Sequence, residues 1–241
     1  MRIIIIRHGE PDNPNQTLTK KGFEEVNALG EFYRDLKFKD AYSSPLARAK
    51  LTAEGFLSHH NNINATILPW LEEFPCKIIP PYLDKKIITW DYLPSYFTKQ
   101  EEFYDNNKYL DHPLFEDANV KEKYNEVVTS FDDLLKNYGY ERDGRIYKVT
   151  QSNRDTIILF CHLGIMSIIM SHIMNIPYIL IAQHFVCPPS GVTILTSEER
   201  ENGIAQFRCS QYGDISHLNA KNLTPSFHGR FCETFDSDER H

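Results

Sequence analysis

The sequence has few cysteines, no long apolar run and no excess of positive charge, and each shortage argues against a class of protein. The five cysteines are odd in number and form no C-x-x-C pair, so neither a zinc site nor a complete disulfide framework is indicated. No stretch approaches the roughly 18 apolar residues of a membrane span, and the N-terminal run of four isoleucines is too short for a signal-peptide core. The net charge of −7 argues against nucleic acid or an anionic membrane as a partner. We expect a cytoplasmic enzyme or binding protein.

The composition is that of an ordinary globular protein, with 41% apolar and 24% charged residues among 241. A chain of this length suits one large domain, which buries roughly 70 to 75% of the surface of its unfolded chain. We therefore predict a single domain over residues 1–241. It carries an insertion at about 75–140 and a polar C-terminal tail at about 219–241.

Strands and helices alternate along the first 60 residues. The β-branched run from Arg2 to His8 predicts a strand buried on both faces. Residues 18–36 show apolar positions three and four apart behind a possible N-cap at Thr19, which predicts a helix. A second strand over Asp40–Ser44 and a second helix over Leu46–Leu57 follow. This alternation is typical of a parallel sheet with helices on its faces.

The later half of the chain repeats this order. An apolar strand over Thr156–Cys161 leads into a long apolar segment. The segments Ser190–Ser197 and Ala205–Gly213, joined by a charged turn, predict an edge hairpin. We therefore expect an α/β fold: a three-layer sandwich with a mostly parallel central sheet and helices on both faces.

The insertion at about 75–140 breaks the alternation. Its first half is rich in proline and aromatic residues, and its second half places Val120, Tyr124, Val127, Phe131 and Leu135 on one helical face. We predict a mainly helical insertion over the active-site edge of the sheet. Its aromatic residues either line a wall for a substrate or form a small core of their own: Trp90, Tyr92, Tyr96 and Phe97.

Two of the predicted central strands end in histidine. His8 follows the first strand, directly after Arg7, and His162 follows the strand Thr156–Cys161. The carboxyl ends of parallel strands meet at one edge, where open α/β sheets bind ligands. Arg7 and His8 are unexpected at the end of a buried strand unless an anion binds there. The plainer alternatives are an ordinary polar strand end for Arg7 and His8, and a core histidine for His162.

Several short motifs occur in a fixed order along the chain. They are Arg7-His8-Gly9-Glu10, Leu18-Thr19 with Gly22, the segment Ser43–Ala49 that contains Arg48, Thr52-Ala53, and His162 after its strand. Together these motifs resemble the histidine phosphatase superfamily, the phosphoglycerate-mutase-like family. The resemblance covers nearly the whole chain in order, outside the insertion and the tail. It implies that His8 is the nucleophile and that Arg7, His8, Arg48 and His162 bind phosphate.

The residue types suit phosphoryl transfer. A transferring phosphoryl group carries negative charge on three oxygens, so the protein's task is positioning and charge stabilisation. Arg7 and Arg48 can each offer a planar bidentate fork, although Arg48 taken singly is more often a solvated helix residue. A neutral His8 can attack phosphorus and form a phosphohistidine, provided that its other ring nitrogen is held by a hydrogen bond. We ascribe Gly9 to a close approach of the backbone to phosphate.

Hydrolysis also needs a proton donor. Family members carry an acid in a Leu-x-Glu context, and the spacing from Leu71 selects Glu73, with Glu72 as the fallback. The plainer reading is a surface acidic pair beside Trp70. A general acid near neutral pH needs a raised pKa, which burial of Glu73 would produce.

The sequence therefore predicts a phosphoric monoester hydrolase: a metal-independent phosphatase that hydrolyses a small phosphate monoester through a phosphohistidine, with no cofactor. The alternatives are a phosphoglycerate mutase-type phosphotransferase, disfavoured because no counterpart of the mutases' arginine pair is present, and a non-catalytic phospho-ligand-binding protein. Leu163, where family members commonly have glycine, predicts lowered activity. His228 and Arg230 are a basic pair in the acidic tail. The substrate and the oligomeric state stay open.

Overall fold

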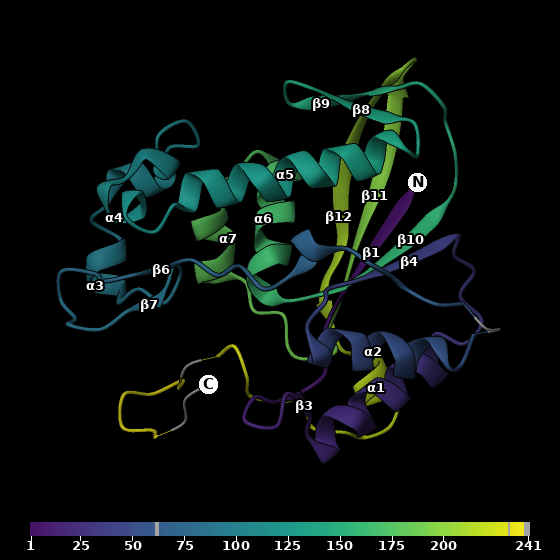
Figure 1. The fold of residues 1–241 in the computed structure, drawn as a ribbon, viewed down its shortest axis with the longest axis horizontal. Coiled ribbons are helices and arrows are strands. Elements are labelled where there is room, and N and C mark those ends of the chain that lie inside the picture. The colour runs from purple at the N-terminus through teal and green to yellow at the C-terminus, as the bar shows by residue number, and fades with distance from the viewer. Residues whose placement is uncertain (61–62, 231, 239–241) are drawn as a thin grey trace.

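The computed structural model describes residues 1–60, 63–230 and 232–238, and its main feature is an eight-stranded sheet with helices on both faces (Figure 1). The strand order is β5-β4-β10-β1-β11-β12-β9-β8. The α/β fold with helices on both sides of a central sheet is confirmed. The strands are β1 (Arg2–Arg7), β4 (Asp40–Ser43), β5 (Thr66–Ile67), β8 (Tyr140–Asp143), β9 (Ile146–Val149), β10 (Thr156–Cys161), β11 (Val192–Glu201) and β12 (Ile204–Asp214).

The sheet is mixed, so the predicted mostly parallel arrangement is correct for only half of it. The strands β5, β4, β10 and β1 are parallel. From β1 outward, β11, β12, β9 and β8 pair antiparallel. The parallel half comes from strand-helix units, because parallel neighbours need a crossover connection, whereas the antiparallel half comes from two hairpins.

The isoleucine run of β1 is divided between two apolar cores. Ile3 and Ile5 join the cluster under one helical layer, and Ile4 and Ile6 join the cluster under the other. Side chains alternate across a strand, and all four are at most 2% exposed. An uninterrupted apolar run is therefore the pattern required of a strand covered on both faces.

The helices form the two outer layers (Figure 1). On one face lie α1 (Lys20–Phe32) and α2 (Ala47–Leu57), with the hydroxyl of Thr19 capping α1 at the backbone N–H of Gly22. On the other face lie α5 (Val120–Lys136) and α6 (Leu163–Met174), with α7 (Tyr178–His184) against α6. The short α8 (Ser216–Asn219) contacts α1.

The predicted hairpin forms, but its predicted place at the edge is wrong. β11 lies directly beside β1, and a second hairpin, β8 with β9, extends the sheet beyond β12. The turn of this second hairpin is Asp143-Gly144, with Gly144 at φ +58°. Asp-Gly is a common two-residue hairpin turn, although the flanking strands have only a weak apolar pattern. The sequence analysis did not predict this hairpin.

The insertion opens with a two-stranded ribbon and is helical afterwards. Its aromatic residues Trp90, Tyr92, Phe97, Phe103 and Phe115 are buried in the same apolar cluster as one face of the main sheet. They therefore pack as an extension of the main core, and not as a core of their own. The elements are β6 (Lys77–Ile78), β7 (Ile87–Ile88), α3 (Pro94–Phe97), η2 (Glu101–Tyr104), η3 (Tyr109–Asp111), α4 (Pro113–Glu116) and α5.

Two small elements complete the fold. A two-stranded ribbon, β2 (Pro11–Asp12) with β3 (Thr17–Leu18), follows the first strand, and the 3₁₀ helix η1 (Pro69–Leu71) follows β5.

Among the described residues, no helix is both long and apolar enough to span a membrane.

Candidate active site

The predicted site residues meet at the carboxyl edge of the parallel strands. β1 and β10 are in register, with Arg7 opposite Cys161, so His8 and His162 leave the sheet side by side. The backbone N–H of His8 donates to the carbonyl of Cys161 (3.0 Å), and the two imidazole centroids lie 5.0 Å apart at 55°. Arg48 lies in the first turn of α2, and Glu73 follows η1.

The ring of His8 is fixed in one tautomer. Its Nδ1 lies 2.8 Å from the carbonyl of Gly9, which can only accept, so Nδ1 carries the proton and Nε2 carries the lone pair. Burial lowers the pKa of His8 well below its usual value, and the charges of Arg7 and Arg48 lower it further. His8 is therefore a neutral imidazole with a fixed orientation at neutral pH.

Arg7 is buried, and one side of its guanidinium is already bonded. Nη1 donates to the carbonyls of Cys187 (2.6 Å) and His228 (3.1 Å). Nε is buried, and among the described residues neither Nε nor Nη2 has a recorded hydrogen-bond partner. Because buried donors are normally bonded, the Nε–Nη2 edge is the part of Arg7 suited to an anion.

Arg48 is half-buried, and its helix is tied to the loop after His8. The hydroxyl of Thr52 donates to the carbonyl of Arg48 (2.7 Å) and accepts from the backbone N–H of Gly9 (3.0 Å). Thr52 is fully buried. The Arg-Ala-x-x-Thr spacing thus places both the guanidinium and the anchor of its helix at the same edge.

His162 is held by Ser44, and its imidazole is not a cation. Its Nε2 lies 2.8 Å from Ser44 Oγ, which also accepts from the backbone N–H of Leu46 (3.2 Å). Burial lowers the pKa of His162 well below its usual value, and His8 and the two arginines add to this. The positive charge of the site therefore comes from Arg7 and Arg48. His162 adds a buried Nδ1 that has no partner among the described residues.

Glu73 faces the site, and Glu72 is exposed. Glu73 Oε1 accepts from the backbone N–H groups of Phe74 (2.9 Å) and Gly164 (3.0 Å), the latter at the start of α6. Burial raises the pKa of Glu73, although these two bonds and the charges of Arg7 and Arg48 act in the opposite direction. The net result is a carboxyl group that holds its proton to a higher pH than a free glutamic acid.

The structure gives packing reasons for Gly9 and Leu163. A Cβ on Gly9 would lie 2.9 Å from the carbonyl oxygen of Gly22 in α1, so packing of α1 accounts for this glycine. Leu163 is 7% exposed and belongs to the apolar cluster. The close approach is at Gly164, where a Cβ would meet Trp90 and Glu73.

Three contributions to the site were not found from the sequence: the carbonyls of Cys187 and His228 and the hydroxyl of Ser44. The carbonyls carry no residue-specific signal, because every residue has one. The Pro-Ser-Phe-His-Gly-Arg segment was noted as unusual in the tail, and the structure places its His228 carbonyl on Arg7.

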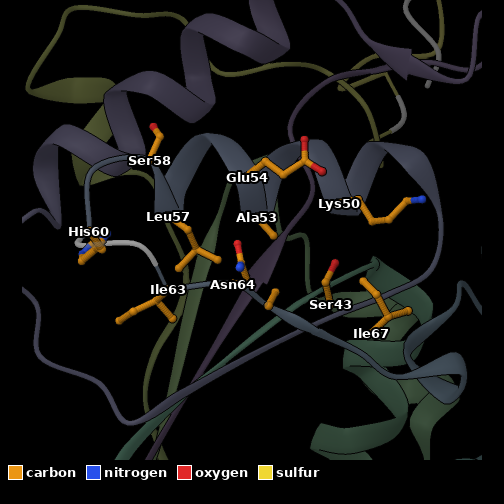
Figure 2. Close-up of a pocket in the computed structure, with 11 residues that line it drawn as sticks. Ser43, Lys50, Ala53, Glu54, Leu57, Ser58, His60, Ile63, Asn64 and Ile67 are labelled. Carbon is orange, nitrogen blue, oxygen red and sulfur yellow. The ribbon is translucent and has the colours of Figure 1, made fainter.

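Two cavities differ in their relation to this site. One, of about 300 Å³, lies beside Arg48 and is lined by Asp12, Asn13, Gln16, Thr17, Leu46, Ala47 and Arg48. Another, of about 330 Å³, lies between α2 and the segment that leads to β5. Figure 2 shows this second cavity, with Lys50 and Glu54 on the helix and Ile63 and Ile67 opposite. It contains none of the predicted site residues.

No group of three or more His, Cys, Asp or Glu side chains within residues 1–60, 63–230 and 232–238 is arranged to hold a metal ion.

Comparison with known proteins agrees with the motifs. Residues 3–79 match the model of the histidine phosphatase superfamily (branch 1). No curated protein sequence matches the chain. The resemblance predicted from the sequence is thereby confirmed, with the family model resting on the N-terminal third of the chain.

Similar solved structures extend this likeness to the whole fold. A mutant phosphoserine phosphatase from Entamoeba histolytica, in complex with phosphoserine, has a TM-score of 0.58 at 17% identity, covering 90% of this chain and 98% of its own. The α-ribazole phosphatase from Shigella flexneri has a TM-score of 0.54 at 17% identity, covering 89% and 97%. A mycobacterial glucosyl-3-phosphoglycerate phosphatase has a TM-score of 0.54 at 15% identity, covering 88% and 98%. At these identities the likeness establishes the fold.

Proposed function

We propose that this chain, which shares its motifs and fold with the histidine phosphatase superfamily, is a phosphatase that hydrolyses a small phosphate monoester through a phosphohistidine at His8, without a metal ion. The observation that carries the proposal is the state of His8. It is a neutral imidazole with its lone pair on Nε2, held by Gly9 and exposed to the charges of Arg7 and Arg48.

The phosphate group binds to three donors in this proposal. The Nε–Nη2 edge of Arg7 supplies a bidentate fork, and Arg48 supplies a second cation. Ser44 donates its hydroxyl hydrogen to His162 Nε2, so that His162 Nδ1 carries a proton and donates to a phosphate oxygen. These fixed donors stabilise the charge on the transferring group without reorganisation.

In the first step, Nε2 of His8 attacks phosphorus and the P–O bond of the ester breaks. Glu73, whose pKa is raised by burial, acts in its protonated form and gives its proton to the leaving alkoxide oxygen. Nδ1 of the phosphorylated ring keeps its proton, and the carbonyl of Gly9 stabilises the positive charge on the ring.

In the second step, the Glu73 carboxylate takes a proton from water as the water oxygen attacks phosphorus. The P–N bond breaks, inorganic phosphate leaves, and His8 returns to its neutral form. Glu73 is again protonated, so atoms and charges balance over the cycle.

The leaving group of the substrate occupies the cavity beside Arg48. Its lining is mainly polar and includes the side chains of Asp12, Asn13, Gln16 and Thr17, which favours a polar leaving group of small size. The similar structures named above are phosphatases, which agrees with this class of substrate.

We further propose that residues 1–241 act as one domain with the insertion at about 75–140. The insertion's aromatic residues share the apolar cluster of the main sheet, which supports one folded unit.

A reducing, cytoplasmic location fits the five free cysteines, three of which are buried.

The test is release of p-nitrophenol from p-nitrophenyl phosphate between pH 5 and 8 with excess chelator, for the parent and His8→Ala. We expect chelator-resistant turnover in the parent and none in His8→Ala, with both proteins folded by circular dichroism. Turnover retained by the variant would remove His8 as the nucleophile. Phosphate binding by the parent without turnover of this and a broader panel of phosphate esters would favour a binding protein.

A further inference from the structure

The C-terminal segment Ser226–Arg230 lies directly on the guanidinium of Arg7. The carbonyl of His228 accepts from Arg7 Nη1 at 3.1 Å, alongside the carbonyl of Cys187. In Figure 1 the yellow C-terminal segment passes close to the purple N-terminal loop after β1. Residues separated by most of the chain thus meet at the candidate phosphate site.

Ser226 holds the turn of this segment. It is fully buried, and its hydroxyl lies 3.2 Å from Nδ1 of His228 within a tight turn. The same hydroxyl accepts from the backbone N–H of His228 at 3.4 Å. These two contacts fix the turn that presents the carbonyl of His228 to Arg7.

Gly229 allows the close approach. Its backbone has φ +88°, which favours glycine. A Cβ at this position would lie 2.6 Å from Nη1 of Arg7 and 3.4 Å from its Cζ. Any larger residue must displace either the segment or the guanidinium.

We propose that Ser226–Arg230 is a positioning element for Arg7. The carbonyls of Cys187 and His228 accept from Nη1. Gly229 lies so close to Nη1 that no Cβ fits between them. The guanidinium therefore has one orientation. That orientation directs the unbonded Nε–Nη2 edge to the anion beside His8. Affinity for phosphate therefore depends on a segment that is far in sequence from the site motifs. This inference rests on the proposed function only because it takes the anion to be phosphate.

Gly229→Ala tests this role, and Gly203→Ala is the matched control. Gly203 also has a positive φ (+75°), but nothing lies within 4 Å of a Cβ there. Both variants place a Cβ on a residue with positive φ, which strains any residue other than glycine, and only the Cβ at position 229 meets Arg7. We expect Gly229→Ala to weaken the Kd of inorganic phosphate, measured by calorimetry, by about tenfold, the size expected for losing a hydrogen bond to a charged group. Gly203→Ala should leave it within about twofold of the parent, as expected of a change with no contact at the site.

A double-mutant cycle separates positioning from a general loss of structure. In an Arg7→Lys background, Gly229→Ala should change phosphate affinity little further, because Lys offers no planar edge to orient. If the two changes add fully, or if Gly229→Ala binds phosphate as the parent does, the inference is wrong. Equal losses in Gly229→Ala and Gly203→Ala would also overturn it.

If Gly229→Ala does not fold, deletion of residues 226–241 removes the His228 carbonyl directly, and the same loss of phosphate affinity is expected. Because the readout is binding, failure of the proposed function appears separately, as phosphate bound by the parent without turnover of esters. A parent that binds no phosphate would overturn the inference itself.

Discussion

At the residue scale, the side chains of the candidate site are held by main-chain groups: the carbonyl of Gly9 lies 2.8 Å from Nδ1 of His8, and the carbonyl of Cys187 accepts from Nη1 of Arg7. His8, Arg48, His162 and Glu73 carry recognisable motifs, and the structure brings them together with Arg7. Their partners include main-chain carbonyls, whose position depends on the fold and not on residue type. The sequence also cannot give the charge of His162, because its lowered pKa comes from burial.

The raised pKa of Glu73 leads to a prediction about leaving groups. Loss of a general acid costs roughly 10²–10⁴-fold, but only where the leaving group needs a proton. We expect Glu73→Gln to lower kcat/KM strongly for an alkyl phosphate and much less for p-nitrophenyl phosphate, whose phenolate leaves unprotonated. Glu72→Gln, at the exposed neighbour, is the control.

The pH dependence of kcat/KM for the parent and Glu73→Gln tests whether Glu73 acts as an acid. Glu73 acts while protonated, and burial raises its pKa, so kcat/KM of the parent for the alkyl phosphate falls as pH rises through that pKa. In Glu73→Gln this fall should disappear. Equal losses on both substrates would contradict the acid role.

At the element scale, the parallel half of the sheet was predictable and the antiparallel half was partly missed. β1 and β10 are recognisable as apolar strands that end in histidine, since each is buried between two layers. β4 alternates buried and half-buried residues and is recognisable mainly by the helix that follows it. The hairpin of β8 and β9 has mixed, half-exposed residues, which give a weaker apolar pattern. Its Asp-Gly turn was the available signal.

The start of α6 is where the insertion reaches the site, and Gly164 tests that contact. A Cβ on Gly164 would press on Trp90 and on Oε1 of Glu73. Gly164→Ala should therefore lower kcat about ten- to hundredfold, as expected when a catalytic group is displaced by about 1 Å. Gly144→Ala, at a hairpin turn with nothing within 4 Å of its Cβ, is the control. Unchanged turnover in Gly164→Ala would show that Glu73 does not depend on this contact.

At the scale of the whole molecule, one buried carboxyl couples stability to pH. Glu25 in α1 accepts from the backbone N–H of Glu10 (2.8 Å) and is fully buried. Burial raises its pKa from 4.5 to about 7, with a smaller contribution from the charge of Glu10. The folded state thus holds a proton that the unfolded chain releases above about pH 4.5.

The direction in which stability changes with pH follows from this proton. Stability is greatest below about pH 4.5 as far as Glu25 is concerned, falls as pH rises towards about 7 and is constant above. The total change is about 3 kcal/mol. Glu25→Gln should flatten this part of the denaturation profile between pH 4.5 and 7, measured by urea unfolding, whereas Glu24→Gln at the exposed neighbour should not. A Glu25→Gln profile parallel to that of the parent would disprove the assignment.

The position of β1 also governs how the chain folds in time. Ile5 is opposite Leu159 on one side and Thr193 on the other, so the first strand made has no neighbour until more than half of the chain has followed. Closing such non-local pairs is slow, and an unpaired apolar strand is prone to aggregation meanwhile. The run of isoleucines that holds His8 rigid in the finished sheet is thus the segment most in need of protection in the nascent chain.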